Sequence, residues 1–489
     1  MKVLLNSPGY SYDVHSLVKA FFPEEDVEVI SFDDAADRND SICVSVSSGD
    51  IPDGVIRSGT ICVSAPGENG DMRFEEEYHD MCRPQVKNQL KRVLYNMLTE
   101  LSGRTLPWGT MTGIRPTKVP MKMICEGCDD ERISDHMRSE YLCSKEKIDL
   151  ATKIAHREKS ITDSIKEDGF ALYIGIPFCP TTCMYCSFTS YPIASWKDRV
   201  DEYIRALKKE LDFFKVYYDG RCPDSIYIGG GTPTTLLPQQ LEDLIRSVKE
   251  RFDTSSLREF TVEAGRPDSI TDDKLRVLKN MGVDRISINP QTMNDKTLKI
   301  IGRAHSVADV YKAYDTARSA GFDNINMDLI MGLPGEDEDD VAVTLDKVGK
   351  LSPDSLTIHS MAIKRAAGMA RFLSEHSDIA SVNTPHMMEM AHDCASALGL
   401  VPYYLYRQKN MAGNFENVGY AREGKFGIYN IAIMEEVCDI AAVGAGTISK
   451  RIFADNRIER CDNVKDVALY IDRIDDMIDK KAKLFDKGE

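Results

Sequence analysis

The sequence lacks any long apolar run. No stretch of the 489 residues approaches the roughly 20 consecutive apolar residues that a membrane-spanning helix needs. Residues 1–5 continue into Asn-Ser-Pro-Gly instead of the apolar core of a secretory signal. We therefore expect no membrane partner and a location in the cytoplasm.

Positive charge is also in short supply. The chain has 61 Lys and Arg residues against 78 Asp and Glu residues, which gives a net charge of -17. Such a surface has no long-range attraction for nucleic acid or for an anionic membrane, so nucleic acid is not expected as a partner either. An anionic substrate would have to be bound by individual arginines or lysines inside a pocket.

The 13 cysteines are not typical of a disulfide framework. Their odd number favours a reducing compartment, where thiols stay free or bind metals. Hydrophobic residues make up 42% of the chain, which fits a globular protein, and the length predicts about three domains.

Three of the cysteines are concentrated in residues 171–191, ALYIGIPFCPTTCMYCSFTSY. An apolar run typical of a buried strand precedes a loop in which Cys179, Cys183 and Cys186 have C-x3-C-x2-C spacing. Three thiolates hold three irons of a 4Fe-4S cluster and leave the fourth iron open. With this spacing we expect S-adenosylmethionine on that iron, where the reduced cluster cleaves it to a 5'-deoxyadenosyl radical. Phe178 and Tyr185 would shield the cluster from solvent.

A zinc site is the alternative for this loop. Three cysteines and a distant histidine or cysteine can hold zinc, although zinc motifs more often consist of two separated C-x2-C pairs. A further C-x2-C, Cys125 and Cys128, has no second pair at metal spacing. We interpret these two as unliganded thiols, with a second cluster or a redox pair as the alternatives.

From residue 171 to about 360 the pattern repeats strand, loop and helix. Strands are predicted at 171–176, 225–229, 259–263, 285–289, 324–330 and 355–359, and helices at 198–216, 239–251, 272–281, 306–320 and 337–351. Six such units predict an α/β fold, a partial (β/α)6 barrel of parallel strands with its chemistry at their carboxyl ends.

The flanking regions have other patterns. Short strands at 2–6, 27–32, 41–47 and 61–65 predict a small α/β domain over 1–80, and a helical connector is predicted over 81–168. Prolines and glycines interrupt the connector at 106–120, either as a packed loop or as a gate. The barrel domain is expected to span 169–362. Residues 363–489 are then predicted to form a C-terminal α+β domain on the substrate side, ending in an amphipathic surface helix at 462–489.

Glycines or polar residues stand at the ends of successive barrel strands. The run 229–234, GGGTPT, follows the second strand and lets a ligand approach the backbone. Glu263 ends the third strand, and Asp328 lies in the fifth. Gln291 follows the fourth strand, with Arg303 beyond it. Carboxylates bind amines or ribose hydroxyls and arginine binds carboxylates, so we expect these residues around a cofactor.

These motifs resemble those of the radical S-adenosylmethionine (radical SAM) superfamily. Within it they are similar to the group of oxygen-independent coproporphyrinogen III oxidases and heme chaperones, and most of all to the HemZ-type coproporphyrinogen dehydrogenases. The similarity extends along essentially the whole chain and is carried by YIGIPFCPTTCMYCSFTSY, TVEAGRPDSI, GLPGE and YRQKNMAGNFENVGYA.

The resemblance implies a 4Fe-4S cluster on Cys179, Cys183 and Cys186 and one or two molecules of S-adenosylmethionine. The residues implied to contact the first molecule are Tyr173, Gly230, Glu263, Gln291, Arg303 and Asp328. Those implied for a second molecule are Tyr185, Gly231, Thr232 and Ala362.

The resemblance also implies a reaction, the oxidative decarboxylation of coproporphyrinogen III to protoporphyrinogen IX. The radical would abstract hydrogen from a propionate β-carbon, and a flavodoxin- or ferredoxin-type protein would reduce the cluster. The alternatives are a radical methyltransferase or another porphyrin- or heme-modifying enzyme, and a heme-binding chaperone with little activity.

Three positions depart from the pattern of the relatives. Gly175 stands where the oxidases and chaperones usually have histidine, and Tyr185 replaces a phenylalanine. The segment GIYNIAIMEE lacks the histidine of the chaperone signature, which weakens the case for heme binding of that kind. Further on, an aromatic and basic segment either caps the barrel mouth over a tetrapyrrole or forms a C-terminal sheet packed on the barrel; its residues are Tyr403, Tyr404, Tyr406, Arg407, Lys409 and Asn414.

Overall fold

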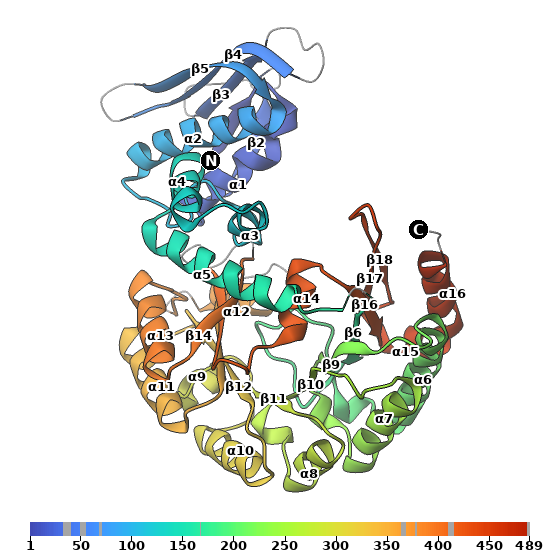
Figure 1. Ribbon diagram of the computed structural model, residues 1–489. Helices are drawn as coiled ribbons and strands as arrows, with labels where there is room; N and C mark the ends of the chain where they lie inside the picture. The colour runs from blue at the N-terminus through green and yellow to red at the C-terminus, as the bar shows by residue number, and fades with distance from the viewer. Residues whose placement is uncertain are drawn as a thin grey trace. The chain divides into compact units, whose positions relative to one another are not determined.

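The computed structural model describes residues 1–32, 41–48, 55–67, 71–166, 168–362, 368–376, 379–408 and 415–486. Over this described part the chain divides into two compact units (Figure 1). Unit 1 contains residues 1–156 and 407–410, and unit 2 contains residues 157–406 and 411–489. The division into four domains with boundaries near 80, 168 and 362 stays a prediction.

Unit 1 is built on a mixed sheet with the strand order β2-β1-β3-β4-β5 among its described residues. The strands are β1 (Lys2–Leu5), β2 (Glu28–Ser31), β3 (Ser41–Ser48), β4 (Val55–Ala65) and β5 (Met72–Cys82). Strands β2, β1 and β3 are parallel, and β3, β4 and β5 are antiparallel. The four predicted strands are confirmed, but the sequence analysis missed β5, because its charged residues give no alternating apolar pattern.

Unit 1 also contains helices, of which the first two in the chain contact this sheet. The helices are α1 (Ser11–Phe21), α2 (Arg83–Ser102), α3 (Lys118–Cys125), α4 (Asp130–Tyr141) and α5 (Lys145–Thr162), of which the end of α5 belongs to unit 2. The loop at 106–120 has a fully buried Trp108, and a Cβ on Gly109 would lie 1.9 Å from the Tyr141 carbonyl oxygen. These contacts favour the packed-loop interpretation over a gate.

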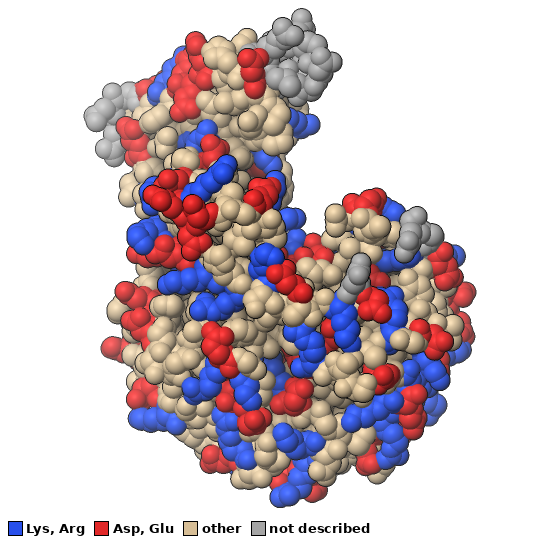
Figure 2. Space-filling model, in the orientation of Figure 1, with Lys and Arg blue, Asp and Glu red and all other residues tan. Residues whose placement is uncertain are grey.

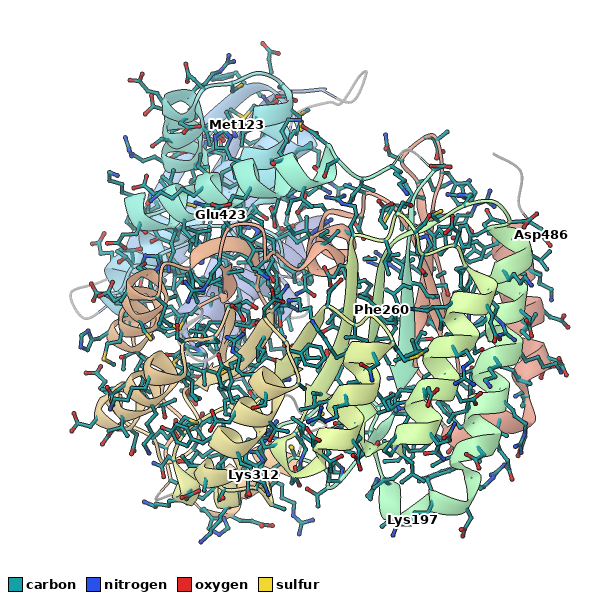
Figure 3. All side chains as sticks on the ribbon, turned by 60° about the horizontal axis from the view of Figure 1, so that its bottom comes forward. Met123, Lys197, Phe260, Lys312, Glu423 and Asp486 are labelled. Atoms are coloured by element: carbon teal, nitrogen blue, oxygen red, sulfur yellow. The ribbon has the colours of Figure 1, made fainter. Side chains whose placement is uncertain are left out.

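The centre of unit 2 is formed by parallel strands in the order in which they occur in the chain. They are β6 (Phe170–Ile176), β9 (Pro223–Gly230), β10 (Glu259–Gly265), β11 (Arg285–Ile288), β12 (Ile325–Met331) and β13 (Ser355–Ser360). Helices cover their outer side: α6 (Val200–Tyr217), α7 (Pro238–Arg251), α8 (Asp272–Asn280), α10 (Val307–Ser319) and α11 (Glu338–Leu351) (Figure 1). Figure 3 shows Phe260 of β10 inside this layer and Lys312 of α10 on it. The predicted partial barrel is confirmed.

The C-terminal segment extends both edges of the barrel sheet. At one edge β15 (Asn417–Ala421) is antiparallel to β13, and β14 (Val401–Tyr406) is antiparallel to β15. At the other edge β16 (Asp439–Val443) is parallel to β6, followed by β17 (Ile448–Ile452) and β18 (Ile458–Asp462). The described residues thus form a sheet of 11 strands with the barrel in its middle.

The remaining helices of unit 2 are α9 (Asp295–Ile300), α12 (Gly368–Glu375), α13 (Pro385–Ala397), α14 (Ile428–Glu435), α15 (Val467–Asp472) and α16 (Ile474–Phe485). The predicted amphipathic surface helix is confirmed as α16, whose Asp475, Asp476 and Asp479 are exposed, although the region 462–489 also contains α15. Lys481 of α16 is fully buried and ion-paired with the equally buried Glu210 of α6, which also accepts hydrogen bonds from the Tyr470 hydroxyl at 2.6 Å and from Asn463 at 2.8 Å. An amphipathic pattern cannot reveal a buried partner for its charged residues.

Neither unit offers a membrane span. No helix within the described ranges is long and apolar enough to cross a membrane. Figure 2 shows Lys and Arg interspersed with Asp and Glu over the visible face. The surface charge on this face is therefore mixed.

Candidate functional site

The cysteine loop begins directly after β6 and is closed by a short strand pair. Strand β7 (Phe178–Cys179) pairs in parallel with β8 (Tyr191–Pro192). Residues at the end of β9 hold the start of the loop by two backbone hydrogen bonds. The amide of Gly231 donates to the Ile176 carbonyl at 2.8 Å, and the amide of Thr232 donates to the Phe178 carbonyl at 2.7 Å. The Thr232 hydroxyl lies 3.5 Å from the Cys179 sulfur. The end of β9 therefore fixes the position of the first thiol.

Gly231 allows this close approach because it has no side chain. A Cβ there would lie 2.7 Å from the Phe178 carbonyl oxygen, 2.9 Å from the Ile176 carbonyl oxygen and 3.0 Å from the Cys179 sulfur. Two of these neighbours are backbone atoms, which cannot move aside as a flexible side chain would. The geometry thus requires glycine next to the thiol.

Arg266 holds the other side of the loop. This side chain is only 3% exposed, and its Nη1 donates to the Thr181 carbonyl at 3.0 Å and to the Thr181 hydroxyl at 2.6 Å. The same nitrogen lies 3.9 Å from the Cys183 sulfur, and Asp268 pairs with the guanidinium at 2.7 Å. A buried cation beside a thiolate ligand stabilises negative charge on the sulfur.

The protonation of the Cys179 thiol is linked to metal binding. Burial raises the pKa of the Cys179 thiol to about 11, so it stays protonated until a metal displaces the proton. Among the described residues no group of three or more His, Cys, Asp or Glu side chains is spaced to hold a metal ion.

The barrel interior is marked by a row of partly exposed positions in otherwise buried strands. Tyr173 is the partly exposed residue of β6, Gly230 of β9, Glu263 of β10 and Asp328 of β12. All four were predicted as site residues, and the structure brings them to one side of the sheet. Solvent-reachable space in the barrel therefore lies against these four positions.

Glu263 lies under a stack of tyrosines. Its Oε1 accepts a hydrogen bond of 2.6 Å from the Tyr227 hydroxyl, and the Tyr227 ring stacks on Tyr429 of α14, with centroids 4.6 Å apart. Tyr173 stacks on the same Tyr429 ring at 5.7 Å. Burial raises the pKa of Glu263 to about 7, and this shift disfavours its charged form unless a cation binds beside it.

Gln291 is held in a strained backbone conformation after β11. Its φ is +70°, which is uncommon for a residue other than glycine. Its amide donates to the Asp328 carbonyl at 2.9 Å, and its carbonyl accepts from the Ile330 amide at 2.9 Å. Its side-chain Oε1 is buried without a hydrogen-bond partner among the described residues. A buried acceptor in this state is suited to a ligand hydroxyl or amine.

Arg303 and Tyr185, predicted for two different cofactor molecules, contact each other. The Tyr185 hydroxyl accepts hydrogen bonds from Arg303 Nε at 3.2 Å and from Nη2 at 3.0 Å. The guanidinium also donates to the Asn289 carbonyl. The Tyr185 hydroxyl therefore engages the predicted carboxylate-binding arginine. Ala362 lies just beyond β13 and is partly exposed.

Close packing explains why position 175 is a glycine. A Cβ at this position would lie 2.6 Å from Cγ2 of Thr447, which follows β16. A histidine therefore does not fit at this point of β6. The C-terminal segment occupies the space that a side chain would need.

The residues of the aromatic C-terminal segment lie in different environments. Tyr403 is buried and stacks on Phe426, with centroids 5.1 Å apart, whereas Tyr406 is partly exposed. Strands β14 and β15 confirm the interpretation as a C-terminal sheet. Arg407 belongs to unit 1, where its Nη1 donates to the Met111 carbonyl at 2.6 Å. Lys409 and Asn414 lie outside the described residues.

Two residues beside the predicted site were not expected from the sequence. His359 is the partly exposed residue of β13, and Arg266 contacts the cysteine loop. Their signals were a histidine at the end of the sixth predicted strand and an arginine in TVEAGRPDSI. A single polar residue of this kind is more often structural than functional, so neither stood out.

Comparison with known proteins identifies the family. The Radical SAM superfamily model matches residues 173–348. The chain is 41% identical over 410 residues to the oxygen-independent coproporphyrinogen-III oxidase-like protein HemZ of Bacillus subtilis, covering 82% of each protein. The chain belongs to the HemZ-like family of radical SAM proteins.

Other relatives match a smaller part. Heme chaperone HemW of Bacillus subtilis is 40% identical over 195 residues, which is 39% of this chain and 50% of that protein. Among solved structures, coproporphyrinogen III oxidase (HemN) from Escherichia coli matches with a TM-score of 0.51 and 23% identity, covering 66% of this chain and 73% of that one. This structural likeness supports the fold.

As a radical SAM protein, the chain uses a 4Fe-4S cluster and S-adenosylmethionine. The residues present fit both groups. The thiols share one loop, Gly231 leaves space beside Cys179 where a Cβ would collide, and Gln291 offers a buried acceptor with no partner in the described ranges.

Proposed function

We propose that this protein catalyses the oxygen-independent oxidative decarboxylation of coproporphyrinogen III to protoporphyrinogen IX. The observation that carries the proposal is the 41% identity, over 82% of the chain, to a relative named for its likeness to oxygen-independent coproporphyrinogen-III oxidase. The row of polar residues facing the barrel interior supports it, because the reaction needs a cofactor and a substrate held at one end of a barrel.

In this proposal Cys179, Cys183 and Cys186 bind the three protein-ligated irons. The first S-adenosylmethionine is bound by Tyr173, Gly230, Glu263, Gln291, Arg303 and Asp328, and a second by Tyr185, Gly231, Thr232 and Ala362. The hydrogen bonds between Tyr185 and Arg303 connect the two sets.

With S-adenosylmethionine bound, the cluster would supply a 5'-deoxyadenosyl radical for abstraction of a hydrogen atom from a propionate β-carbon. Loss of carbon dioxide and transfer of one electron to a one-electron acceptor would then leave a vinyl group, and the conversion to protoporphyrinogen IX needs this at two propionates. The barrel residues position the reacting carbon, because a primary radical attacks the nearest C–H bond. The stacked rings of Tyr173, Tyr227 and Tyr429 form an aromatic wall beside Glu263.

We further propose a cytoplasmic location and a flavodoxin- or ferredoxin-type electron donor. All 13 cysteines of the chain are free thiols, which supports a reducing compartment.

The test is anaerobic incubation of the cluster-loaded protein with coproporphyrinogen III, S-adenosylmethionine and a strong reductant. We expect 5'-deoxyadenosine together with a porphyrinogen that has lost carbon dioxide, detected by mass. A product that has gained carbon would indicate a methyltransferase. Formation of neither 5'-deoxyadenosine nor a decarboxylated product would refute the proposal.

A heme chaperone is the second candidate, because relatives named HemW match 39% to 62% of the chain at 27% to 40% identity. Protein that binds heme stoichiometrically but never forms 5'-deoxyadenosine would favour this function. The absence of histidine from GIYNIAIMEE, which forms α14 with Tyr429 inside the barrel, speaks against heme binding by that segment.

A further inference from the structure

The row of partly exposed positions in the barrel continues beyond the predicted cofactor residues. In β13 the partly exposed residue is His359, whose side chain is 25% exposed. Its neighbour across β12 and β13 is Ile330, so His359 lies closer to the carboxyl edge of the sheet than Asp328, which pairs with Thr357. His359 therefore stands at the open end of the barrel.

Strand β14 brings a second donor to the same edge. Both β13 and β14 are antiparallel to β15, so β14 runs in the direction of the barrel strands and Tyr406 lies at its carboxyl end. The Tyr406 hydroxyl is 3.4 Å from His359 Nδ1. This contact is long for a hydrogen bond that involves a hydroxyl, so a ligand oxygen can compete with it for the imidazole.

The other ring nitrogen of His359 faces a carboxylate. Nε2 lies 3.7 Å from Asp328 Oδ2, and burial would raise the pKa of Asp328, but His359 and neighbouring hydrogen-bond donors lower it overall. Asp328 is thus charged, and it also accepts a 2.7 Å hydrogen bond from Asn326. The imidazole of His359 thus has one ring nitrogen beside Asp328 and the other beside the Tyr406 hydroxyl, toward the barrel opening.

Two arginines of the barrel have hydrogen-bond partners away from His359. Arg303 donates to Tyr185 and to the Asn289 carbonyl. Arg285 is 1% exposed at the amino end of β11, where it donates to Ser355 at 3.1 Å. An anionic group that enters from the β13 and β14 side therefore meets the imidazole and the phenol.

We propose that His359 and Tyr406 bind a carboxylate of the substrate at the β13 and β14 side of the barrel. This inference rests on the proposed tetrapyrrole function and assigns one propionate of that substrate to the pair. The carboxylate accepts from the imidazole N–H and from the phenol O–H. It holds its side chain, and with it the reacting carbon, at the strand ends where the cofactor residues lie.

The experiment compares two stable porphyrins that differ only in their carboxylates. Coproporphyrin III and its tetramethyl ester are titrated, in the same mild detergent buffer, into anaerobic cluster-loaded protein without reductant, and porphyrin fluorescence gives each dissociation constant. The readout is the preference for the acid over the ester. General loss of structure would weaken both porphyrins alike and would not change this ratio.

We expect His359→Ala to reduce the acid preference by about tenfold to a hundredfold, because hydrogen bonds to charged groups are of this strength. Tyr406→Phe should reduce it by a smaller factor, and His359→Gln, which keeps an N–H donor, should restore part of it. His392→Ala is the matched control: this histidine of α13 also contacts a tyrosine hydroxyl, Tyr420 at 3.3 Å, but lies outside the barrel. It should leave the ratio unchanged.

The outcomes separate the two proposals. An unchanged acid preference in His359→Ala, with wild-type protein that still decarboxylates coproporphyrinogen III, overturns the carboxylate site alone. Wild-type protein that binds neither porphyrin overturns this inference together with the proposed function. Heme is titrated as a third ligand. If the heme absorption band shifts in a way that depends on His359, and the protein shows no preference for the acid over the ester, His359 is an iron ligand and the carboxylate site is overturned.

Discussion

Replacing Glu263 by glutamine should make the protein more stable and at the same time weaken its binding of S-adenosylmethionine. Burial raises the pKa of this carboxyl from 4.5 to about 7. One pKa unit corresponds to about 1.4 kcal/mol, so the ionised form destabilises the folded state by about 3 kcal/mol above pH 7. Because the folded pKa is the higher one, this cost falls as the pH drops from 7 and vanishes near 4.5.

Glutamine removes the charge and can still accept the hydrogen bond from Tyr227. We therefore expect Glu263→Gln to raise the free energy of unfolding of the iron-free protein by up to about 3 kcal/mol at pH 8, and by less than about 1 kcal/mol at pH 5. Urea unfolding at the two pH values measures this difference. A gain of the same size at both pH values would refute the argument.

The binding experiment uses the cluster-loaded protein. If Glu263 binds the cofactor amine, wild-type affinity for S-adenosylmethionine should rise with pH through about 7, since the ionised carboxylate is the binding form. Glu263→Gln should bind about tenfold to a hundredfold more weakly at pH 8, with little pH dependence. Glu336→Gln serves as the control, because burial also raises the pKa of Glu336, to about 6, but this carboxyl pairs with Thr292 outside the row of strand-end residues. Unchanged affinity in Glu263→Gln would contradict the assignment.

Three further substitutions test other parts of the structure. Gly231→Ala should reduce the iron content after anaerobic reconstitution to a small fraction of wild type, because its Cβ would lie 2.7 Å from a backbone oxygen and 3.0 Å from the Cys179 sulfur; a full complement of iron would be inconsistent with this packing. Tyr185→Phe should tighten binding of S-adenosylmethionine by about threefold, since it releases Arg303 from a hydrogen bond of ordinary strength, and weaker binding measured at equilibrium would argue against it. Lys481→Met should lower the free energy of unfolding by about 3–5 kcal/mol, as it leaves Glu210 charged and buried, and a loss below about 1 kcal/mol in urea would show that the pair is not needed.

The barrel was predictable because its signals are local. Each parallel strand is an apolar run, and several helices begin with the expected capping residues, such as Ser306 with Asp309 in α10 and Asp337 with Asp340 in α11. The cysteine spacing is equally local. These features follow from neighbouring residues alone.

The missed features depend on partners far along the chain. The hydrogen bonds between Arg303 and Tyr185 join residues 118 positions apart, and those between Lys481 and Glu210 join residues 271 positions apart. His359 became visible as a site residue only when β14 placed Tyr406 beside it. Composition and periodicity do not predict contacts between residues so far apart in the chain.

The attachment of C-terminal strands to both edges of the barrel sheet has a consequence for biosynthesis. Strand β6 carries the cysteine loop and is made early, but its outer neighbour β16 leaves the ribosome only after all the other barrel strands, and Tyr429 arrives just before it. Until then the β6 edge of the nascent sheet is open to aggregation. The protein must therefore complete its fold, and acquire iron in its final environment, near the end of translation or afterwards.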